Sequence, residues 1–233
     1  MQALHPSRRE ALPRHARRGD RRLIAFEAPT SVGEHGRPYA NLLVMSTARR
    51  LHYSYEDYLA SLAVSPLKLE FFDGAIFAMA GGTVAHGQLS AAIIMALGRV
   101  LSKGCRVATS DVKVRIESSD LSTFPDASVI CGDARTAAVD VNAVVNPSIL
   151  VEVTSRSTED YDRGDKLSHY KQLTTLEAVI FVSHRARRIT VVERTNHAWT
   201  ERDFRGGETV VIDASKISFA VDDVYDGIAV DTH

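Results

Sequence analysis

The chain has 233 residues, of which 45% are hydrophobic and 24% are charged, and its formal net charge is −1. This length and composition provide enough apolar residues for one globular domain with a sizeable core, and they exclude the fibrous and disordered classes. No apolar run reaches the roughly 20 residues that a membrane span requires, so we expect a soluble cytoplasmic protein without a membrane partner.

The N-terminal region differs in charge from the rest of the chain. Its first 22 residues carry seven arginines against Glu10 and Asp20, a net charge of +5, which leaves −6 for the remainder. We therefore expect a basic, disordered arm over residues 1–50 and a single domain over residues 51–233. A second interpretation stays open, in which the arm is a non-specific DNA tether.

The first elements are a helix, a hairpin and a second helix. Ser54 is a suitable N-cap for a short helix, and the turn pair Asp73-Gly74 between two apolar runs predicts a β-hairpin over residues 67–80. Thr83 is a suitable N-cap for a long apolar helix over residues 84–104. Period-two alternation then predicts a strand over residues 106–117, with one polar face.

The two cysteines have no spacing typical of a metal site or a redox motif. Cys105 and Cys131 form neither a C-x-x-C pair nor a Cys/His pattern. We expect two reduced thiols, with Cys131 in the core.

Two short apolar runs, each introduced by a proline, predict adjacent strands over residues 125–131 and 147–155. A polar loop and a helix follow, with Asp162 as a candidate N-cap and Lys166 near the first turn. The C-terminal part reads as further strands with turns at 184–187, 195–196 and 206–207. This order of elements predicts an α/β (α+β) fold with a mixed β-sheet flanked by helices and additional C-terminal strands.

The predicted strands each carry one carboxylate in an apolar setting. Mg²⁺ is usually held by one or two protein carboxylates, and Asp126 and Glu152 meet that need if their strands are neighbours. The backbone carbonyl of Val153 is a candidate third ligand, and Lys166 is a candidate to position an attacking water. Simpler interpretations remain open: a local turn cap for Asp126, a solvent-facing edge strand for Glu152 and a solvated helix position for Lys166.

A wider pattern carries a family resemblance. The "PD" of residues 125–126 and "LVEVTSRSTEDYDRGDKLSHY" of 150–170, together with "EFFDGAIFAMAGGTVAHGQL" of 70–89 and "SDVKVRIE" of 110–117, resemble the Uma-two family within the PD-(D/E)XK nuclease superfamily. The resemblance implies a restriction-endonuclease-like core, hydrolysis of phosphodiester bonds with Mg²⁺ or Mn²⁺, and a homodimer.

The resemblance also assigns roles to individual residues. Asp126 matches the aspartate of the "PD" element and Glu152 matches the acid of the "(D/E)XK" element. Thr154 occupies the position of the superfamily's usual lysine, and Lys166 matches the lysine that this family places on the following helix. Because Thr154 follows Glu152 by two residues, the departure removes a charge from the expected metal-binding face.

Four further residues are candidates. Glu70 matches an acid before the family's "DG" turn and His86 matches a histidine at the start of the apolar helix, although a core histidine is an equally simple interpretation. Asp111 and Lys113 lie on the expected polar strand face, where Lys113 is the alternative to Lys166 as the active-site lysine.

The sequence thus predicts a metal-dependent endonuclease acting on nucleic acid, with DNA as the expected substrate. The alternative is a catalytically weak nuclease-fold protein that acts as a nucleic-acid-binding or dimerising module. In that case the arm and the basic stretch over residues 183–188 would supply phosphate contacts.

Overall fold

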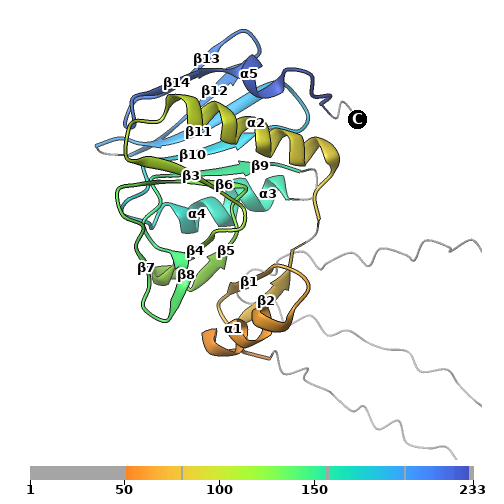
Figure 1. Cartoon of the computed structure of the whole chain (residues 1–233), viewed down its shortest axis with the longest axis vertical. Coiled ribbons are helices and arrows are strands. Elements are labelled where there is room, and N and C mark those ends of the chain that lie inside the picture. Colours follow the sequence, from red (N-terminus) through yellow and green to blue (C-terminus); the bar gives the residue numbers. More distant parts are fainter. Residues whose placement is uncertain (1–50, 80, 156–157, 197, 231–233) are drawn as a thin grey trace, which may run out of the picture. The chain divides into compact units, whose positions relative to one another are not determined.

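A computed structural model describes residues 51–79, 81–155, 158–196 and 198–230 (Figure 1). The predicted basic arm, residues 1–50, lies outside the described residues. None of the helices in the described part of the chain has the length and apolar character that a membrane crossing needs.

The strands form two six-stranded sheets and one hairpin. The first sheet has the order β2 (Ala75–Ala78), β1 (Leu69–Phe72), β5 (Leu121–Thr123), β4 (Lys113–Ile116), β8 (Asp140–Val144), β7 (Thr136–Ala137). The second has the order β12 (Trp199–Arg205), β11 (Arg188–Arg194), β10 (Ala178–Val182), β9 (Ile149–Val153), β6 (Ala127–Cys131), β3 (Cys105–Thr109). The hairpin pairs β13 (Thr209–Ile212) with β14 (Ile217–Ala220). Both large sheets are mixed, because β4–β8 and β9–β10 are parallel pairs.

Local sequence signals explain the first elements. Ser54 and Asp57 form a reciprocal capping box at the start of α1 (Tyr55–Val64). Asp73 and Gly74 turn the β1–β2 hairpin with positive φ angles of 44° and 74°, which Gly and Asp tolerate better than most residues. Thr83 caps α2 (Val84–Val100). The predictions for these three elements are confirmed.

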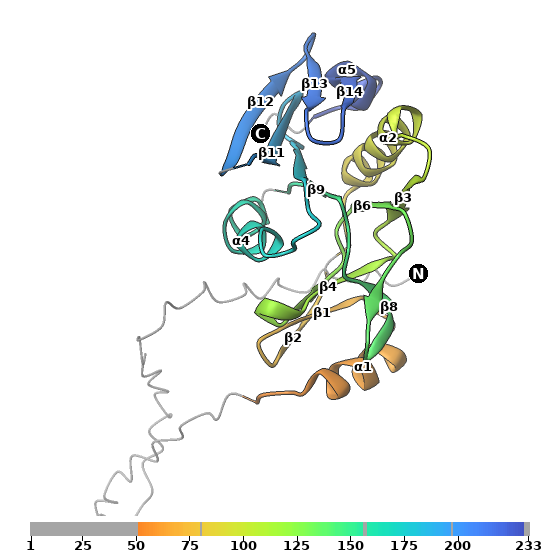
Figure 2. The same cartoon turned by 90° about the vertical axis from the view of Figure 1, so that its left-hand side faces the viewer.

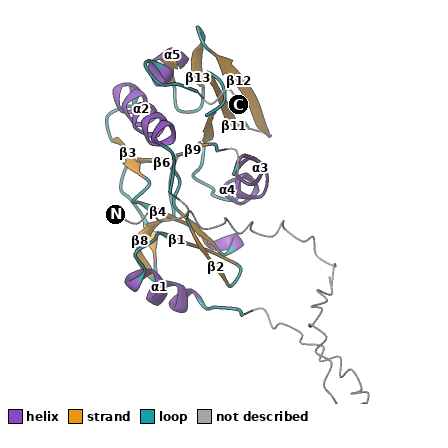
Figure 3. Cartoon of the chain, turned by 90° about the vertical axis from the view of Figure 1, so that its right-hand side faces the viewer, coloured by secondary structure: helices purple, strands orange, loops and turns teal. Residues whose placement is uncertain are grey.

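Two helical layers cover opposite faces of the second sheet (Figures 2 and 3). The helix α2 and the short α5 (Val221–Tyr225) lie on one face, where Leu89, Ile93 and Leu97 pack with Val151 and Val153. The other face carries a composite helix made of α3 (Glu159–Tyr161), the π-helical turn η2 (Asp162–Lys166) and α4 (Leu167–Tyr170). There Leu150 and Phe181 pack with α4 and with β4 and β5 of the first sheet. The composite helix therefore lies between the two sheets.

The stretch expected to be one strand over residues 106–117 is two strands in different sheets. β3 and β4 are separated by a turn, and all four residues of β4 are buried, so the expected polar face does not exist. The reason is that α1 covers that face, where the Arg115 guanidinium lies 4.0 Å from the Tyr55 ring centroid. A cation buried against an aromatic face is stabilised by the ring quadrupole. The 3₁₀ turn η1 (Glu117–Ser119) then leads to β5.

The expectation of two reduced cysteines was wrong. Cys105 on β3 and Cys131 on β6 form a disulfide, and Cys131 is exposed rather than in the core. The two residues face each other directly in the antiparallel β3–β6 register, with a Cα–Cα distance of 4.0 Å. Only the strand pairing brings them together, because 26 residues separate them in sequence.

Candidate active site

Asp126 lies where the chain passes from one sheet to the other. β5 ends at Thr123 in the first sheet and β6 begins at Ala127 in the second, so residues 124–126 form the crossing. Pro125 is buried there and, having no N–H, leaves no donor unsatisfied. The Asp126 carboxylate accepts a hydrogen bond from the Val153 backbone N–H at 2.7 Å. Asp126 is thereby anchored to β9, the strand that carries Glu152.

Glu152 comes from the neighbouring strand. β6 and β9 are antiparallel, with Ala127 opposite Val151, so the prediction that these two strands are adjacent is confirmed. Alternation along β9 directs Val151 and Val153 toward α2, and Leu150 and Glu152 toward the composite helix. Glu152 is only 4% exposed, so the alternative of a solvent-facing edge strand is wrong.

Lys166 reaches Glu152 from the composite helix. Its Nζ lies 2.9 Å from Glu152 Oε1, and the Lys166 side chain is buried. Charged groups are rarely buried without a partner, and Lys166 has three: the carboxylates of Glu70 and Asp162 lie 3.7 Å and 3.8 Å from the same ammonium. The interpretation of Lys166 as a solvated helix residue is therefore also wrong.

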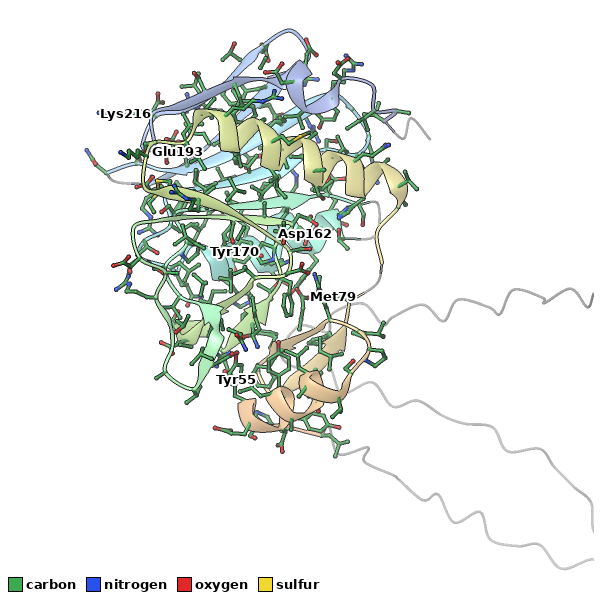
Figure 4. All side chains as sticks on the ribbon, viewed as in Figure 1. Tyr55, Met79, Asp162, Tyr170, Glu193 and Lys216 are labelled. Atoms are coloured by element: carbon green, nitrogen blue, oxygen red, sulfur yellow. A yellow bond between two sulfur atoms is a disulfide. The ribbon has the colours of Figure 1, made fainter. Side chains whose placement is uncertain are left out.

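Asp162 was expected to cap the helix, but it lies inside it. Helical structure begins at Glu159, and Asp162 is buried at the start of the π-helical turn. Asp162 and Lys166 are four residues apart and form an ion pair on one side of the composite helix. Figure 4 labels Asp162 and Tyr170 on this helix, in the interior between the sheets. Asp162 thus belongs to the site, where the composite helix places its carboxylate beside the Lys166 ammonium.

Glu70 comes from the first sheet. Its Oε1 accepts a hydrogen bond from Thr123 Oγ1 and faces the Lys166 ammonium. Thr123 is the last residue of β5, three positions before Asp126. The two sheets therefore contribute acids to one cluster around Lys166.

His86 lies in the first turn of α2 and contacts the site through Asp126. Its Nε2 lies 2.9 Å from Asp126 Oδ1, and this hydrogen bond raises the pKa of His86. The structure thus places His86 beside a candidate metal ligand, at a part-buried position rather than in the apolar core.

Tyr170 was not among the residues selected from the sequence. It is fully buried on α4, and its hydroxyl donates a hydrogen bond to Glu152 Oε1. Tyr170 follows Lys166 by four residues, so both side chains lie on the same face of the helix. The four-residue spacing between Lys166 and Tyr170 was the signal in the sequence that could have identified Tyr170. It places the tyrosine on the helix face that carries the candidate lysine.

Burial and crowding of acids control the electrostatics of the cluster. Burial raises the pKa of Glu152 to about 8; the charges of Asp162 and Asp126 add to the rise, whereas Lys166 and the Tyr170 hydroxyl oppose it. Burial likewise raises the pKa of Asp162. For Lys166, burial acts to lower the pKa, but the surrounding carboxylates, chiefly Glu152, outweigh it and hold the pKa well above its usual range. The site carries more acidic than basic groups and attracts cations.

Asp111 and Lys113 belong to other interactions. The Lys113 ammonium lies 2.6 Å from the buried Asp140 carboxylate on β8, which also accepts a hydrogen bond from the Tyr55 hydroxyl. Asp111 is 82% exposed and pairs with Lys68. The structure brings neither residue into the cluster around Lys166.

Asp126 and Glu152 have the ligand chemistry that a hard divalent cation prefers. Among the described residues, no group of three or more His, Cys, Asp and Glu side chains has an arrangement that could hold a metal ion. Mg²⁺, however, usually takes only one or two protein carboxylates and completes its shell with water and substrate oxygens. Asp126 accepts a hydrogen bond from the backbone N–H of Val153, the residue next to Glu152. Carboxylate oxygens have further lone pairs beyond those used by His86, Val153 and Lys166.

The chain matches relatives along most of its length. It is 33% identical over 178 residues to "Uncharacterized protein slr1290" of Synechocystis sp., covering 76% of this chain and 93% of the relative. It is 26% identical over 153 residues to "Uncharacterized protein sll1609" of the same organism, covering 64% of this chain and 83% of that relative.

A solved structure and a family model agree with the fold and the motifs. The structure of a "putative nuclease belonging to DUF820" from Anabaena variabilis aligns with a TM-score of 0.61 at 13% identity, covering 75% of this chain and 98% of the other. At that identity the likeness shows the fold alone. Residues 55–222 match the model of the Uma2 family, described as "Putative restriction endonuclease". That match spans Glu70, Asp126, Glu152 and Lys166, and the chain belongs to the Uma2 family.

Proposed function

We propose that the protein is a metal-dependent endonuclease that hydrolyses phosphodiester bonds of nucleic acid, with DNA as the expected substrate and Mg²⁺ or Mn²⁺ as the cofactor. One observation carries the proposal: Asp126, the residue just before β6, accepts a hydrogen bond from the Val153 N–H beside Glu152, and the buried Lys166 ammonium lies 2.9 Å from Glu152 Oε1. A module that only binds nucleic acid would gain nothing from buried acids directed at a phosphate, because like charges repel. The homodimer and the cytoplasmic location stay predictions.

Each residue has a distinct part in this proposal. Asp126 and Glu152, with the Val153 carbonyl as a third candidate, would hold the cation, which supplies Lewis-acid activation of water and neutralises charge on the phosphate. Lys166 donates hydrogen bonds to the attacking water or to the developing negative charge. Glu70 and Asp162 keep the Lys166 ammonium charged and in place. The Tyr170 hydroxyl fixes the orientation of the Glu152 carboxylate.

Cleavage of a fluorescent DNA duplex by single variants tests the assignment of the lysine. Lys166→Met should lose roughly 10²-fold or more in rate, which is typical when a preorganised charge stabiliser is removed. The matched control is the double variant Lys113→Met/Asp140→Asn, because removing Lys113 alone would leave the buried Asp140 carboxylate without its cation. The control should cut at nearly the parental rate. Retained cleavage by Lys166→Met, with loss in the control, would transfer the role to Lys113.

A further inference from the structure

The turn between β10 and β11 presents a dense group of basic side chains. Residues 183–188 include Arg185, Arg187 and Arg188, whose side chains are 48%, 51% and 30% exposed. They follow the fully buried strand β10 directly, so they are the first residues to emerge from the core. Arginine is well suited to phosphate because its planar fork donates several hydrogen bonds.

Backbone hydrogen bonds hold this turn in one conformation. The Ser183 N–H donates to the Arg188 carbonyl at 3.0 Å and closes the turn, and the Gly206 N–H donates to the Arg187 carbonyl at 3.0 Å. The buried Tyr225 hydroxyl of α5 lies 2.8 Å and 2.7 Å from the carbonyl oxygens of Ser183 and Arg188, to which it donates. A turn fixed at both ends loses little entropy when it binds a ligand.

Strand register places the turn at the same edge of the sheet as the candidate active site. β9 and β10 run parallel, with Glu152 opposite Phe181 and Val153 opposite Val182. Val182 is paired with Val153, so the turn begins at the next residue, Ser183, just past the end of β9. In Figure 1 the β9 arrow ends on the side of the molecule where the composite helix begins.

The composite helix connects the turn to Lys166. Glu159, its first residue, lies 3.8 Å from Arg185 and 3.6 Å from Arg188. Lys166 follows seven residues later, about 10 Å along a helix at about 1.5 Å per residue. That distance is roughly three base-pair steps measured along the axis of a DNA duplex, at about 3.4 Å of rise per step.

The arginines of the turn have acidic neighbours, but none of these ion pairs is as short as a charge-assisted hydrogen bond. Glu159 is a single carboxylate shared by Arg185, Arg188 and Arg163, and Arg187 and Arg188 lie 3.6 Å and 4.0 Å from Asp222 and Asp203. All of these separations exceed the roughly 2.7–2.9 Å of a charge-assisted hydrogen bond. The Nε atom of Arg188 is buried without a hydrogen-bond partner among the described residues. The guanidinium groups of Arg185 and Arg188 thus share one anion, Glu159, as they would share a phosphate.

We propose that the turn 183–188 contacts the phosphate backbone of the nucleic-acid substrate a few nucleotides from the scissile bond. This inference rests on the proposed function. The contacts are to phosphate rather than to base edges, so they position the strand and carry no sequence preference.

Binding of a fluorescent 20-base-pair duplex in EDTA, followed by polarisation across a series of salt concentrations, tests the inference without cleavage. Arg185→Gln/Arg187→Gln should bind roughly tenfold more weakly, and its log–log salt slope should fall by about 2, because each phosphate contact contributes about 0.9. Duplexes of different sequence should be affected equally. Arg185→Lys/Arg187→Lys should retain the wild-type slope.

The matched control is Lys103→Gln/Arg106→Gln, which removes the same charge from exposed positions at the opposite end of the second sheet. It should keep the wild-type slope. If wild type binds and cuts DNA but the turn variant matches this control, the inference on the turn fails while the proposed function stands. If wild type neither binds nor cuts, the proposed function fails and takes the inference on the turn with it.

Discussion

Glu152 is the residue where burial and charge conflict most strongly. Its carboxylate lies inside the molecule beside Lys166 and Tyr170, with Asp126 and Asp162 acting on it as further negative charges. An isolated ion in such a place would be very costly, and the lysine only partly compensates. A second cation at this position would relieve the conflict, which is the physical reason to expect metal binding here.

The pKa of Glu152 gives the metal-free protein an unusual pH dependence. Its folded-state pKa of about 8 lies above the ordinary value of 4.5, so the folded chain binds more protons than the unfolded chain between these pH values. Stability should therefore fall as pH rises from about 4.5 to 8, by at most roughly 1.4 kcal/mol per pH unit. Asp162 and His86, whose pKa values are also raised, contribute in the same direction. Burial lowers the pKa of His169, which contributes in the opposite direction, and Lys166 stays protonated throughout this range.

Denaturant unfolding in EDTA at pH 5 to 8 measures this effect. Glu152→Gln, which resembles the protonated acid, should flatten most of the decline and should be more stable than wild type near pH 8. Glu56→Gln on the exposed side of α1 should leave the wild-type dependence unchanged. A wild-type protein whose stability rises over this range would show that Glu152 is ionised in the fold.

Helices and strands that begin at a strong local signal could be predicted from the sequence. Contacts between residues far apart in the sequence could not. The capping serine, the Asp73-Gly74 turn and the two proline-led strands gave their elements correctly, because each signal acts within a few residues. The polar face expected for residues 106–117 was wrong, because burial of Lys113 and Arg115 depends on α1, fifty residues earlier. No signal within residues 106–117 indicates that α1 covers this face of the strand.

The β3–β6 disulfide is the clearest case of a long-range feature. Purified under non-reducing conditions and then denatured, the protein should show no thiol that reacts with Ellman's reagent. Cys131→Ser should lower the free energy of unfolding by about 3 kcal/mol, because the bond closes a loop of about 26 residues in the unfolded chain. Two reactive thiols per chain, with unchanged stability in the variant, would contradict the disulfide.

At the scale of the whole molecule, the candidate site exists because two sheets and two helical layers meet at one place. Glu70 comes from the first sheet, Asp126 from the crossing between the sheets, Glu152 from the second sheet, and Lys166 from the helix between the sheets. The sequence suggested these four residues through chemistry and family resemblance. Asp162 and Tyr170 were missed, since their roles depend on the composite helix lying against β9.

Metal-dependent cleavage of supercoiled plasmid DNA tests the central claim most directly. Wild-type protein and Glu152→Gln would be incubated with Mg²⁺, Mn²⁺ or EDTA; the glutamine variant is preferable to alanine because Glu152 is buried and packed. We predict nicked and linear products from wild type with either metal, none with EDTA, and a loss of roughly 10²-fold or more in the variant. Cleavage at the parental rate by Glu152→Gln, or no cleavage by wild type together with no calorimetric binding of Mn²⁺, would contradict the account.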